Sequence, residues 1–153
     1  MNKYEIATGN REDIEAIAQF QVDMAAESEG TTLDYEKALK GVSAVMDDSA
    51  KGTYIIAKKD NKAIASLMLT KEWSDWNNGW YWWIQSVYVA PEHRQSGVYK
   101  AMYAHVKELA KTQNVPQVRL YVDKTNIRTQ KVYSNLGMHE SHYLMYEETM
   151  SPL

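Results

Sequence analysis

Residues 87–100, VYVAPEHRQSGVYK, constrain the fold more than any other part of this 153-residue chain. A run of β-branched and aromatic residues ends at Pro91, which has no backbone N–H and cannot continue a central strand. A polar, basic stretch follows, and Gly97 stands at the start of a long amphipathic segment. This order predicts a helix N-terminus whose unpaired amides and positive dipole end bind an anion such as a phosphate or pyrophosphate. Gly97 lets a ligand approach the backbone because it has no Cβ.

A second segment, residues 126–138, reads NIRTQKVYSNLGM. It predicts a helix that begins at Asn126 and ends at Gly137, a residue typical of helix C-termini. Tyr133 lies seven residues after Asn126, about two helical turns along. The two segments therefore place an anion site and a phenol on two separate helices.

The first segment resembles the acetyl-coenzyme A loop of the GNAT superfamily of N-acetyltransferases, which reads Arg/Gln-x-x-Gly-x-Gly/Ala. Here the loop is Arg94-Gln95-Ser96-Gly97-Val98-Tyr99, so that Tyr99 replaces the last small residue. In the later segment Asn126, Tyr133 and Gly137 fall where the family has Asn, Tyr and Gly. The similarity in element order extends from about residue 3 to residue 147.

The resemblance implies that acetyl-coenzyme A is the cosubstrate and that its pyrophosphate lies on the loop before the helix. It also implies that backbone amides of the preceding strand hold the pantetheine arm and polarise the thioester carbonyl. Asn126 either contacts this arm or only caps its helix, because Asn is a strong N-cap. The expected cofactor-binding residues are Val87, Tyr88, Val89, Arg94, Gln95, Ser96, Gly97, Val98, Tyr99, Lys100 and Asn126.

Tyr133 matches the tyrosine that serves the family as general acid. A thiol with a pKa of about 8.5 can take a proton from a tyrosine of pKa about 10 at a cost of roughly 2 kcal/mol. Tyr133 is therefore the expected catalytic acid, and the alternative is a buried helix tyrosine that packs on the sheet.

The general base is less clearly marked. In the spermidine/spermine acetyltransferase branch, which the chain resembles loosely, a carboxylate lies on the strand before the loop, but here Gln85 occupies that position. Glu72 is the candidate base and Glu27 a candidate acceptor-binding residue, with Asp75 and Glu29 as further carboxylates. For each of them a solvated surface carboxylate is the alternative.

Five tryptophans lie within eleven residues in the segment around residues 73–83. Trp73 and Trp76 flank an expected loop and, with Gln85, are candidates for an acceptor pocket in which an aromatic ring contacts an ammonium group. Core packing or a subunit interface is the alternative, which we prefer for at least two of the five.

Charge is distributed unevenly along the chain. Residues 1–50 carry 4 Lys/Arg and 11 Asp/Glu, a net charge of −7, while residues 93–131 carry 8 Lys/Arg and 2 Asp/Glu, a net charge of +6. An anionic cofactor at the basic segment and a cationic acceptor near the acidic half suit this pattern, although solvated helix faces explain it equally well. No nucleic-acid recognition motif accompanies the basic residues.

Composition narrows the class of protein. The chain contains no cysteine, which excludes disulfides, thiolate metal sites and a catalytic cysteine, and we expect no metal. No apolar run has membrane-spanning length and the first ten residues do not resemble a signal peptide, so we expect no membrane partner and a cytoplasmic location. Aromatic surface and the family resemblance favour a homodimer.

Hydrophobic periodicity predicts one α/β domain over residues 1–153 with the order β-α-α-β-β-β-α-β-α-β. The resemblance implies the GNAT arrangement, a mixed and mostly antiparallel central sheet with helices on both faces. The expected elements are strands at 3–8, 53–59, 63–70, 80–89, 117–122 and 138–147, a loop at 73–79, and helices from near residue 11, at 34–46, at 97–111 and at 126–136.

The resemblance carried by the two motifs implies an N-acetyltransferase that passes acetyl from acetyl-coenzyme A directly to the primary amine of a small, polyamine-like or other molecule. The alternatives are a protein that binds or senses coenzyme A without turnover, and a peptide or protein N-acetyltransferase. Dinucleotide binding is a poor fit because the loop lacks G-x-G-x-x-G.

Overall fold

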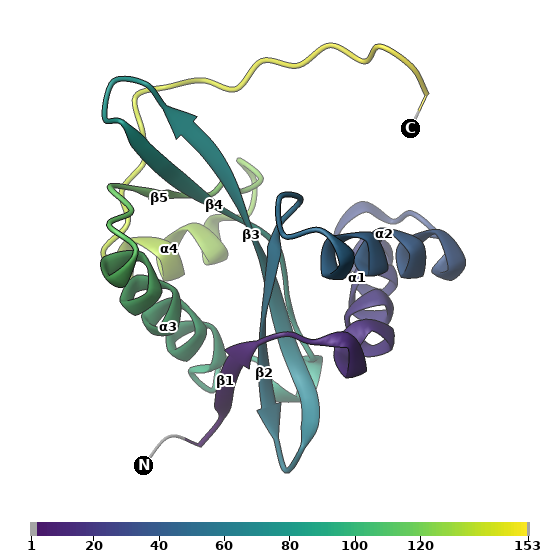
Figure 1. The fold of residues 1–153 in the computed structure, drawn as a ribbon. Coiled ribbons are helices and arrows are strands. Elements are labelled where there is room, and N and C mark those ends of the chain that lie inside the picture. Colours follow the sequence, from purple (N-terminus) through teal and green to yellow (C-terminus); the bar gives the residue numbers. More distant parts are fainter. Residues whose placement is uncertain (1–2, 153) are drawn as a thin grey trace. The chain divides into compact units, whose positions relative to one another are not determined.

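The computed structural model describes residues 3–152, which fall into two compact units, one that ends at Tyr121 and one that begins at Val122. The first unit holds the sheet and three helices, and the second holds one helix (Figure 1). The first unit consists of β1 (Glu5–Thr8), the 3-10 turn η1 (Arg11–Asp13), α1 (Ile14–Glu29), α2 (Tyr35–Asp47), β2 (Thr53–Lys59), β3 (Lys62–Ser74), β4 (Gly79–Val89), the 3-10 turn η2 (Pro91–His93), α3 (Val98–Thr112) and β5 (Val118–Arg119). The helix of the second unit is α4 (Ile127–Asn135).

The five strands lie in the order β1-β2-β3-β4-β5. The first three pairings are antiparallel, and only β4 and β5 run parallel. In Figure 1, α1 and α2 lie on one side of this sheet and α3 lies on the other. The predicted α/β class, with a mixed and mostly antiparallel sheet between helices, is confirmed.

The core has two layers because alternate residues of a strand point to opposite faces. On one face Ile56 of β2 packs with Ile17 of α1 and Val42 of α2. The neighbouring Ile55 is fully buried on the other face, where α3 contacts β2 with a stripe that includes the fully buried Met102. Each face of the sheet is therefore covered by the apolar side of at least one helix.

Side chains cap the first two helical segments. Asn10 and Asp13 form a capping box, in which the Asp13 carboxylate accepts from the Asn10 amide at 2.9 Å. Asp34 caps α2 by accepting from the Glu36 amide at 3.0 Å. Each cap satisfies an amide that has no partner within its helix, and this determines where the helix begins.

The predicted loop over residues 73–79 is wrong. β3 continues to Ser74 and β4 begins at Gly79, so that only residues 75–78 form the turn of a long hairpin. Trp73 lies directly opposite Trp80, and their ring centroids are 5.0 Å apart in an edge-to-face arrangement. Such cross-strand aromatic pairs stabilise a hairpin, and this pairing extends both strands.

Two predicted strands are shorter than expected or missing. The strand expected at residues 117–122 is reduced to Val118 and Arg119, and the one expected at residues 138–147 is not formed. Between residues 120 and 152 the structure assigns no strand, and α4 is the only regular element there. A strand requires a neighbouring backbone to receive its hydrogen bonds, and the pattern of its side chains does not provide one.

Candidate functional site

The loop between β4 and α3 exposes backbone amides. Gly97 is the N-cap of α3 with a φ of +86°, and Gln95 also has a left-handed φ of +60°. No hydrogen bond among residues 3–152 is donated by the amides of Gln95, Gly97 or Val98. A Cβ at Gly97 would meet no atom within 4 Å, so the space above this glycine is open. Unpaired amides at the positive end of a helix bind an anion such as a pyrophosphate.

Side-chain hydrogen bonds hold the loop in place. The Tyr4 phenol, which is buried just before β1, donates to Ser96 Oγ at 2.8 Å, and Ser96 Oγ donates to the carbonyl of His93. The hydrogen bond to Ser96 lowers the pKa of Tyr4. The Ser96 hydroxyl is therefore used within the protein, and this leaves the backbone of the loop to face a ligand.

β4 has strand neighbours on both sides only in its first half. β5 pairs with β4 at Trp82 and Trp83 alone and then ends at Arg119. From Ile84 to Val89, β4 pairs only with β3 in the described part of the chain. This half of β4 therefore presents an open edge of backbone donors and acceptors.

A β-bulge lies within the same half of β4. The pairing register of β3 and β4 shifts between Ser66 and Met68, so that Ser86 and Val87 together face one residue of β3. Ser86 has a φ of +55°, which is uncommon for a residue with a Cβ. A bulge turns the following residues relative to those before it, and bulges are frequent beside active sites.

The direction of the amides after the bulge follows from one hydrogen bond. The Ala90 amide donates to the Ile64 carbonyl at 2.8 Å and therefore points toward β3. Because backbone groups alternate along a strand, the amides of Val87 and Val89 point to the open edge. The Val89 carbonyl confirms this direction, since it accepts from Arg94 Nε at 2.8 Å. The open edge can thus hydrogen-bond an extended, amide-containing ligand as an added strand would.

Arg94 lies at the centre of a cluster with Glu27 and Tyr88. A terminal nitrogen of Arg94 is 2.6 Å from Glu27 Oε2, and the Tyr88 phenol donates to Glu27 Oε1 at 3.1 Å. The Arg94 guanidinium carbon is 5.4 Å from the centre of the Tyr88 ring. The hydrogen bond from Arg94 lowers the pKa of Glu27, while burial, together with the Glu27 carboxylate, raises the pKa of Tyr88 to about 12.

The structure thus brings the predicted Glu27 of α1 to the end of β4, 67 residues along the chain from Arg94. It also shows that the side chain of Tyr88 faces Glu27, so only its backbone remains for a cofactor. Tyr99, where the family has a small residue, stacks on Tyr103 with ring centroids 6.1 Å apart and planes at 8°. Lys100 is exposed in the first turn of α3.

The predicted base, Glu72, lies on β3 rather than in a loop. Its Oε1 accepts from Trp83 Nε1 at 2.7 Å and from Arg119 at 3.3 Å. Glu72 pairs with Tyr81 of β4, and Gln85 lies four residues further along that strand, which corresponds to roughly 13 Å. A direct base must be within hydrogen-bond reach of the proton that it removes.

The candidate aromatic wall is on the hairpin. Trp73 and Trp80 are half exposed, and Trp76 in the turn is 92% exposed. Lys71 Nζ is 5.7 Å from the centre of the Trp80 ring, which shows that this surface can contact an ammonium group. Gln85 lies on β4 opposite Met68, beside the bulge.

The second unit contains the remaining predicted site residues. Asn126 is the N-cap of α4, and its Oδ1 accepts from the Thr129 amide at 3.2 Å. The Asn126 Nδ2 group donates to no acceptor among residues 3–152 and is available to a ligand. Tyr133 lies on α4, and burial raises its pKa. The capping role is therefore confirmed, and it is compatible with a second contact.

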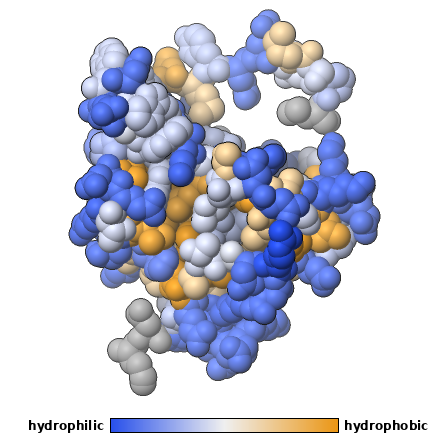
Figure 2. All heavy atoms as spheres, viewed as in Figure 1, coloured by the Kyte–Doolittle hydropathy of each residue, from blue (hydrophilic) through white to orange (hydrophobic). Residues whose placement is uncertain are grey.

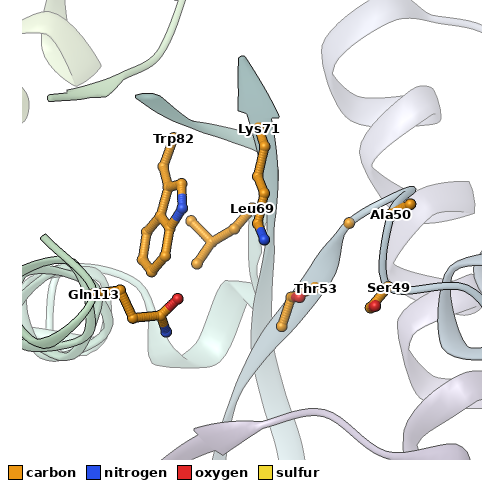
Figure 3. A pocket seen from close by; sticks show the side chains of 8 residues that line it. Ser49, Ala50, Thr53, Leu69, Lys71, Trp82 and Gln113 are labelled. Atoms are coloured by element: carbon orange, nitrogen blue, oxygen red, sulfur yellow. The ribbon is translucent and has the colours of Figure 1, made fainter. Parts of the chain in front are cut away.

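A separate cavity of about 90 Å³ lies between the sheet and the end of α3 (Figure 3). Its lining residues are Ser49, Ala50, Gly52, Thr53, Leu69, Lys71, Trp82 and Gln113. Gln113 is the C-cap of α3 and Gly97 the N-cap, so the cavity lies roughly 20 Å from the amide-rich loop along the helix. The lysine in its wall disfavours a cationic amine, and we assign no role to the cavity.

Two kinds of feature are absent from residues 3–152. No cluster of three or more His, Cys, Asp or Glu side chains is arranged to hold a metal ion. No helix there combines the length and apolar character required to cross a membrane.

Sequence reasoning missed Tyr4 and Arg119. Tyr4 supports the loop from 92 residues away, and Arg119 lies against Tyr81, with 4.4 Å from its guanidinium carbon to the ring centre. No local pattern marks either residue, because both contacts depend on which strands become neighbours.

Comparison with known proteins identifies a matching family and similar solved structures. The sequence profile of the Acetyltransferase (GNAT) family matches residues 14–138. The crystal structure of a possible acetyltransferase from Clostridium difficile 630 is 38% identical, with a TM-score of 0.91, over 99% of this chain and 100% of that one. No curated protein matches the chain significantly.

More distant solved structures share the fold. A ribosomal-protein-alanine N-acetyltransferase from Brucella melitensis biovar Abortus 2308 is 14% identical, with a TM-score of 0.78, over 96% of this chain and 99% of that one. An aminoglycoside N-acetyltransferase in complex with CoA is 18% identical, with a TM-score of 0.78, over 97% of this chain and 95% of that one. With the family match and the 38% identical relative, the chain belongs to the GNAT family of acetyltransferases and is an acyltransferase that depends on acetyl-coenzyme A.

Proposed function

We propose that residues 1–153 form a single acetyltransferase domain that transfers acetyl from acetyl-coenzyme A directly to the primary amine of a small molecule. One observation carries this proposal. The open edge of β4 after Ile84 is continuous with the unpaired amides that precede α3. A diphosphate joined to an extended, amide-containing arm matches this combination of an anion site and a strand edge.

The residues present fit the coenzyme. We assign its pyrophosphate to the loop Arg94–Lys100, where the amides of Gln95, Gly97 and Val98 are the main donors. The open space above Gly97 supports this assignment. Arg94 contributes a guanidinium that is shared with Glu27, because two of its nitrogens are already hydrogen-bonded.

We assign the pantetheine arm to Val87 and Val89, whose amides point to the open edge. These amides also polarise the thioester carbonyl, which the coenzyme brings as the activated acetyl group. Tyr88 contributes only its backbone to this strand edge, because its phenol hydrogen-bonds the Glu27 carboxylate. The Asn126 Nδ2 group is the proposed additional donor to the arm.

Tyr133 is the proposed general acid, which gives its phenolic proton to the departing thiolate. With ordinary pKa values near 8.5 and 10, this transfer costs about 2 kcal/mol. Burial raises the pKa of Tyr133 and therefore increases this cost somewhat, while it keeps the phenol protonated throughout the neutral range. The matching position in the family motif supports the role.

The acceptor amine must lose a proton. An alkylamine of pKa near 10.4 is neutral in only about one molecule in 2,500 at pH 7, which corresponds to roughly 4.6 kcal/mol. We retain Glu72 as the candidate base. Glu72 lies roughly 13 Å along the sheet from Gln85, where we place the acceptor. Water must therefore carry the proton from the amine to Glu72. Glu72 Oε2 accepts no hydrogen bond from residues 3–152 and can receive it.

We propose a polyamine-like acceptor that lies near Gln85. Of the other predicted acceptor-binding residues, Glu27 contacts Tyr88, whereas Trp73 pairs with Trp80 and Trp76 lies in the turn beyond it. Tyr88 and Trp80 are eight residues apart on β4, roughly 26 Å, so a small acceptor contacts either Glu27 or the tryptophans. The net charge of −7 over residues 1–50 supports a cationic molecule, and the exposed rings of Trp73 and Trp76 can contact its ammonium groups. A peptide N-terminus is the second candidate. Relatives of the same fold are named as acting on a ribosomal protein and on aminoglycosides, so the fold does not distinguish between them.

The acceptor can be identified in two steps. A thermal-shift screen of amines, peptides and aminoglycosides in the presence of coenzyme A selects compounds that bind. Thiol release from acetyl-coenzyme A, measured with each selected compound, then identifies those that are acetylated. Polyamines should raise both signals, whereas turnover with peptides alone would overturn the proposed acceptor. A location in the cytoplasm and a homodimeric state remain predictions of the sequence.

A further inference from the structure

The loop before α3 has an uncommon backbone conformation. Gln95 has a φ of +60° and Gly97 a φ of +86°, so that Ser96 lies between two left-handed residues. A left-handed φ is uncommon for a residue with a Cβ, and such conformations persist only where surrounding contacts hold them. The contacts that hold Ser96 therefore determine how well this loop is ordered before a ligand binds.

The side-chain hydrogen bonds of residues 95–97 all pass through Ser96 Oγ in the described part of the chain. This oxygen donates to the carbonyl of His93 and accepts from the Tyr4 phenol at 2.8 Å. The bond to His93 closes the loop on itself, because His93 is only three residues earlier. The bond from Tyr4 joins the loop to a residue 92 positions away in the chain. Tyr4 is therefore the side chain that attaches the centre of the loop to the rest of the protein.

The surroundings of Tyr4 favour this attachment. Tyr4 is 7% exposed and directly precedes β1, whose four residues all pair with β2. β1 also contacts α3, and Ile6 of β1 lines the same groove as Ala101 of α3. Hydrophobic side chains gather on this face around β1 and α3 (Figure 2). In apolar surroundings a chain of hydrogen bonds from phenol to hydroxyl to carbonyl is strengthened, because its members polarise one another.

The loop has a second attachment at its start. Arg94 Nε donates to the Val89 carbonyl at 2.8 Å and joins the loop to β4. Val89 belongs to the strand edge where we place the pantetheine arm. The attachments to Val89 and to Tyr4 together set the position of the loop amides relative to that edge. A ligand that contacts both the loop and the edge binds more tightly when their spacing is fixed beforehand, because less order has to be gained on binding.

We propose that Tyr4 is a positioning residue for the coenzyme. Through Ser96 it holds the loop amides in the conformation that binds the pyrophosphate, and it thereby sets part of the affinity for coenzyme A. This role rests on the proposed function, because the pyrophosphate must lie on the loop for Tyr4 to affect it. It extends the coenzyme site to the start of the chain, to a residue that acts only through Ser96.

A double-mutant cycle in the full-length chain tests this role. Tyr4→Phe keeps the buried ring and removes the phenol oxygen, and Ser96→Ala removes the hydroxyl that the phenol contacts. Tyr54→Phe is the matched control, because Tyr54 is as buried as Tyr4, with 5% exposure, and packs in the core cluster beside α1 and α2. Isothermal titration calorimetry with coenzyme A measures the dissociation constant, and circular dichroism verifies that each variant is folded.

Tyr4→Phe and Ser96→Ala should each raise the dissociation constant by about three- to tenfold, the factor that one hydrogen bond contributes. The double variant should bind about as weakly as Ser96→Ala alone, because the phenol has nothing to hold once the hydroxyl is absent. Tyr54→Phe should bind within twofold of the natural protein. With an acceptor selected by the thermal-shift screen, Tyr4→Phe should raise the KM for acetyl-coenzyme A and leave kcat within twofold, because the bound coenzyme restores the loop.

Tryptic cleavage after Arg94 provides a second readout, in the absence of coenzyme. The bond between Arg94 and Gln95 lies in the loop, and a protease cuts backbone that opens locally. Mass spectrometry of the fragment that begins at Gln95 should show faster cleavage in Tyr4→Phe than in Tyr54→Phe. Added coenzyme A should slow the cleavage in both variants.

Several outcomes would overturn the role of Tyr4 and leave the proposed function intact. These are coenzyme binding by Tyr4→Phe within twofold of Tyr54→Phe, additive losses in the double variant, a fall in kcat as large as the rise in KM, and weaker binding without faster cleavage. A natural protein that does not bind coenzyme A would overturn both the proposed function and the role of Tyr4.

Discussion

Replacement of Gly97 by alanine separates the role of the loop in binding from its role in stability. Gly97 has a φ of +86°, and a Cβ there would meet no atom within 4 Å. The only cost to the free protein is therefore backbone strain, roughly 1–2 kcal/mol for a residue with a Cβ in this region. Gly30 is a matched control, because its φ is +60° and a Cβ there would also meet nothing.

The two variants should differ only in coenzyme binding. The Cβ of Gly97→Ala would occupy the space where we place the pyrophosphate, and would weaken one or two charge-assisted hydrogen bonds worth about 1.5–3 kcal/mol each. A loss of this size raises the dissociation constant by at least tenfold. Isothermal titration calorimetry with coenzyme A measures the affinity, and thermal unfolding measures the strain. Coenzyme binding by Gly97→Ala within twofold of binding by Gly30→Ala would refute the location of the pyrophosphate.

Three further predictions concern proton transfer and pH. Tyr133→Phe should lower kcat by about 10²-fold or more with little change in coenzyme affinity, because general acid catalysis contributes about 10²–10⁴-fold to the rate. Steady-state thiol release measures kcat, and full activity of the variant would exclude the acid role. Glu72→Gln should lower kcat by less than tenfold, since its proton must travel through water, and a loss as large as that of Tyr133→Phe would show that Glu72 acts directly. Burial raises the pKa of Tyr88 to about 12, above the value of about 10 in an unfolded chain, so its contribution to stability is complete below pH 10 and is lost as the pH rises toward 12. The free energy of unfolding should therefore fall by an amount on the order of 2–3 kcal/mol. Chemical denaturation at pH 9–12 should show this fall in the natural protein and not in Tyr88→Phe. An equal dependence of the unfolding free energy on pH in the two proteins would contradict the raised pKa of Tyr88.

Local sequence signals located most elements of the first unit. The helix starts near residues 11, 34 and 97 were identifiable, because their signals lie within one helix turn. The amide-rich loop before α3 was predictable for the same reason. Its glycine, its basic residues and the helix that follows are contiguous.

Interactions between distant residues were not predictable in this way. The pairing of Arg94 with Glu27 joins α1 to the end of β4, and the support of Ser96 by Tyr4 joins the start of the chain to the loop. No periodicity or composition specifies which side chains meet across tens of residues. The hairpin around Trp73 and Trp80 was also misassigned, since a tryptophan-rich segment with Asn and Gly reads as a loop until its two halves are paired.

The sequence by itself therefore determined the helices, most strands, the amide-rich loop and the family resemblance, because these depend on short-range spacing. Only the tertiary structure decided that β5 ends after two residues and that the second half of β4 has an open edge with a bulge. It also decided that no strand is assigned over residues 138–147. The physical reason is that a strand is defined by hydrogen bonds to another strand, and its own residues cannot indicate whether that neighbour is present.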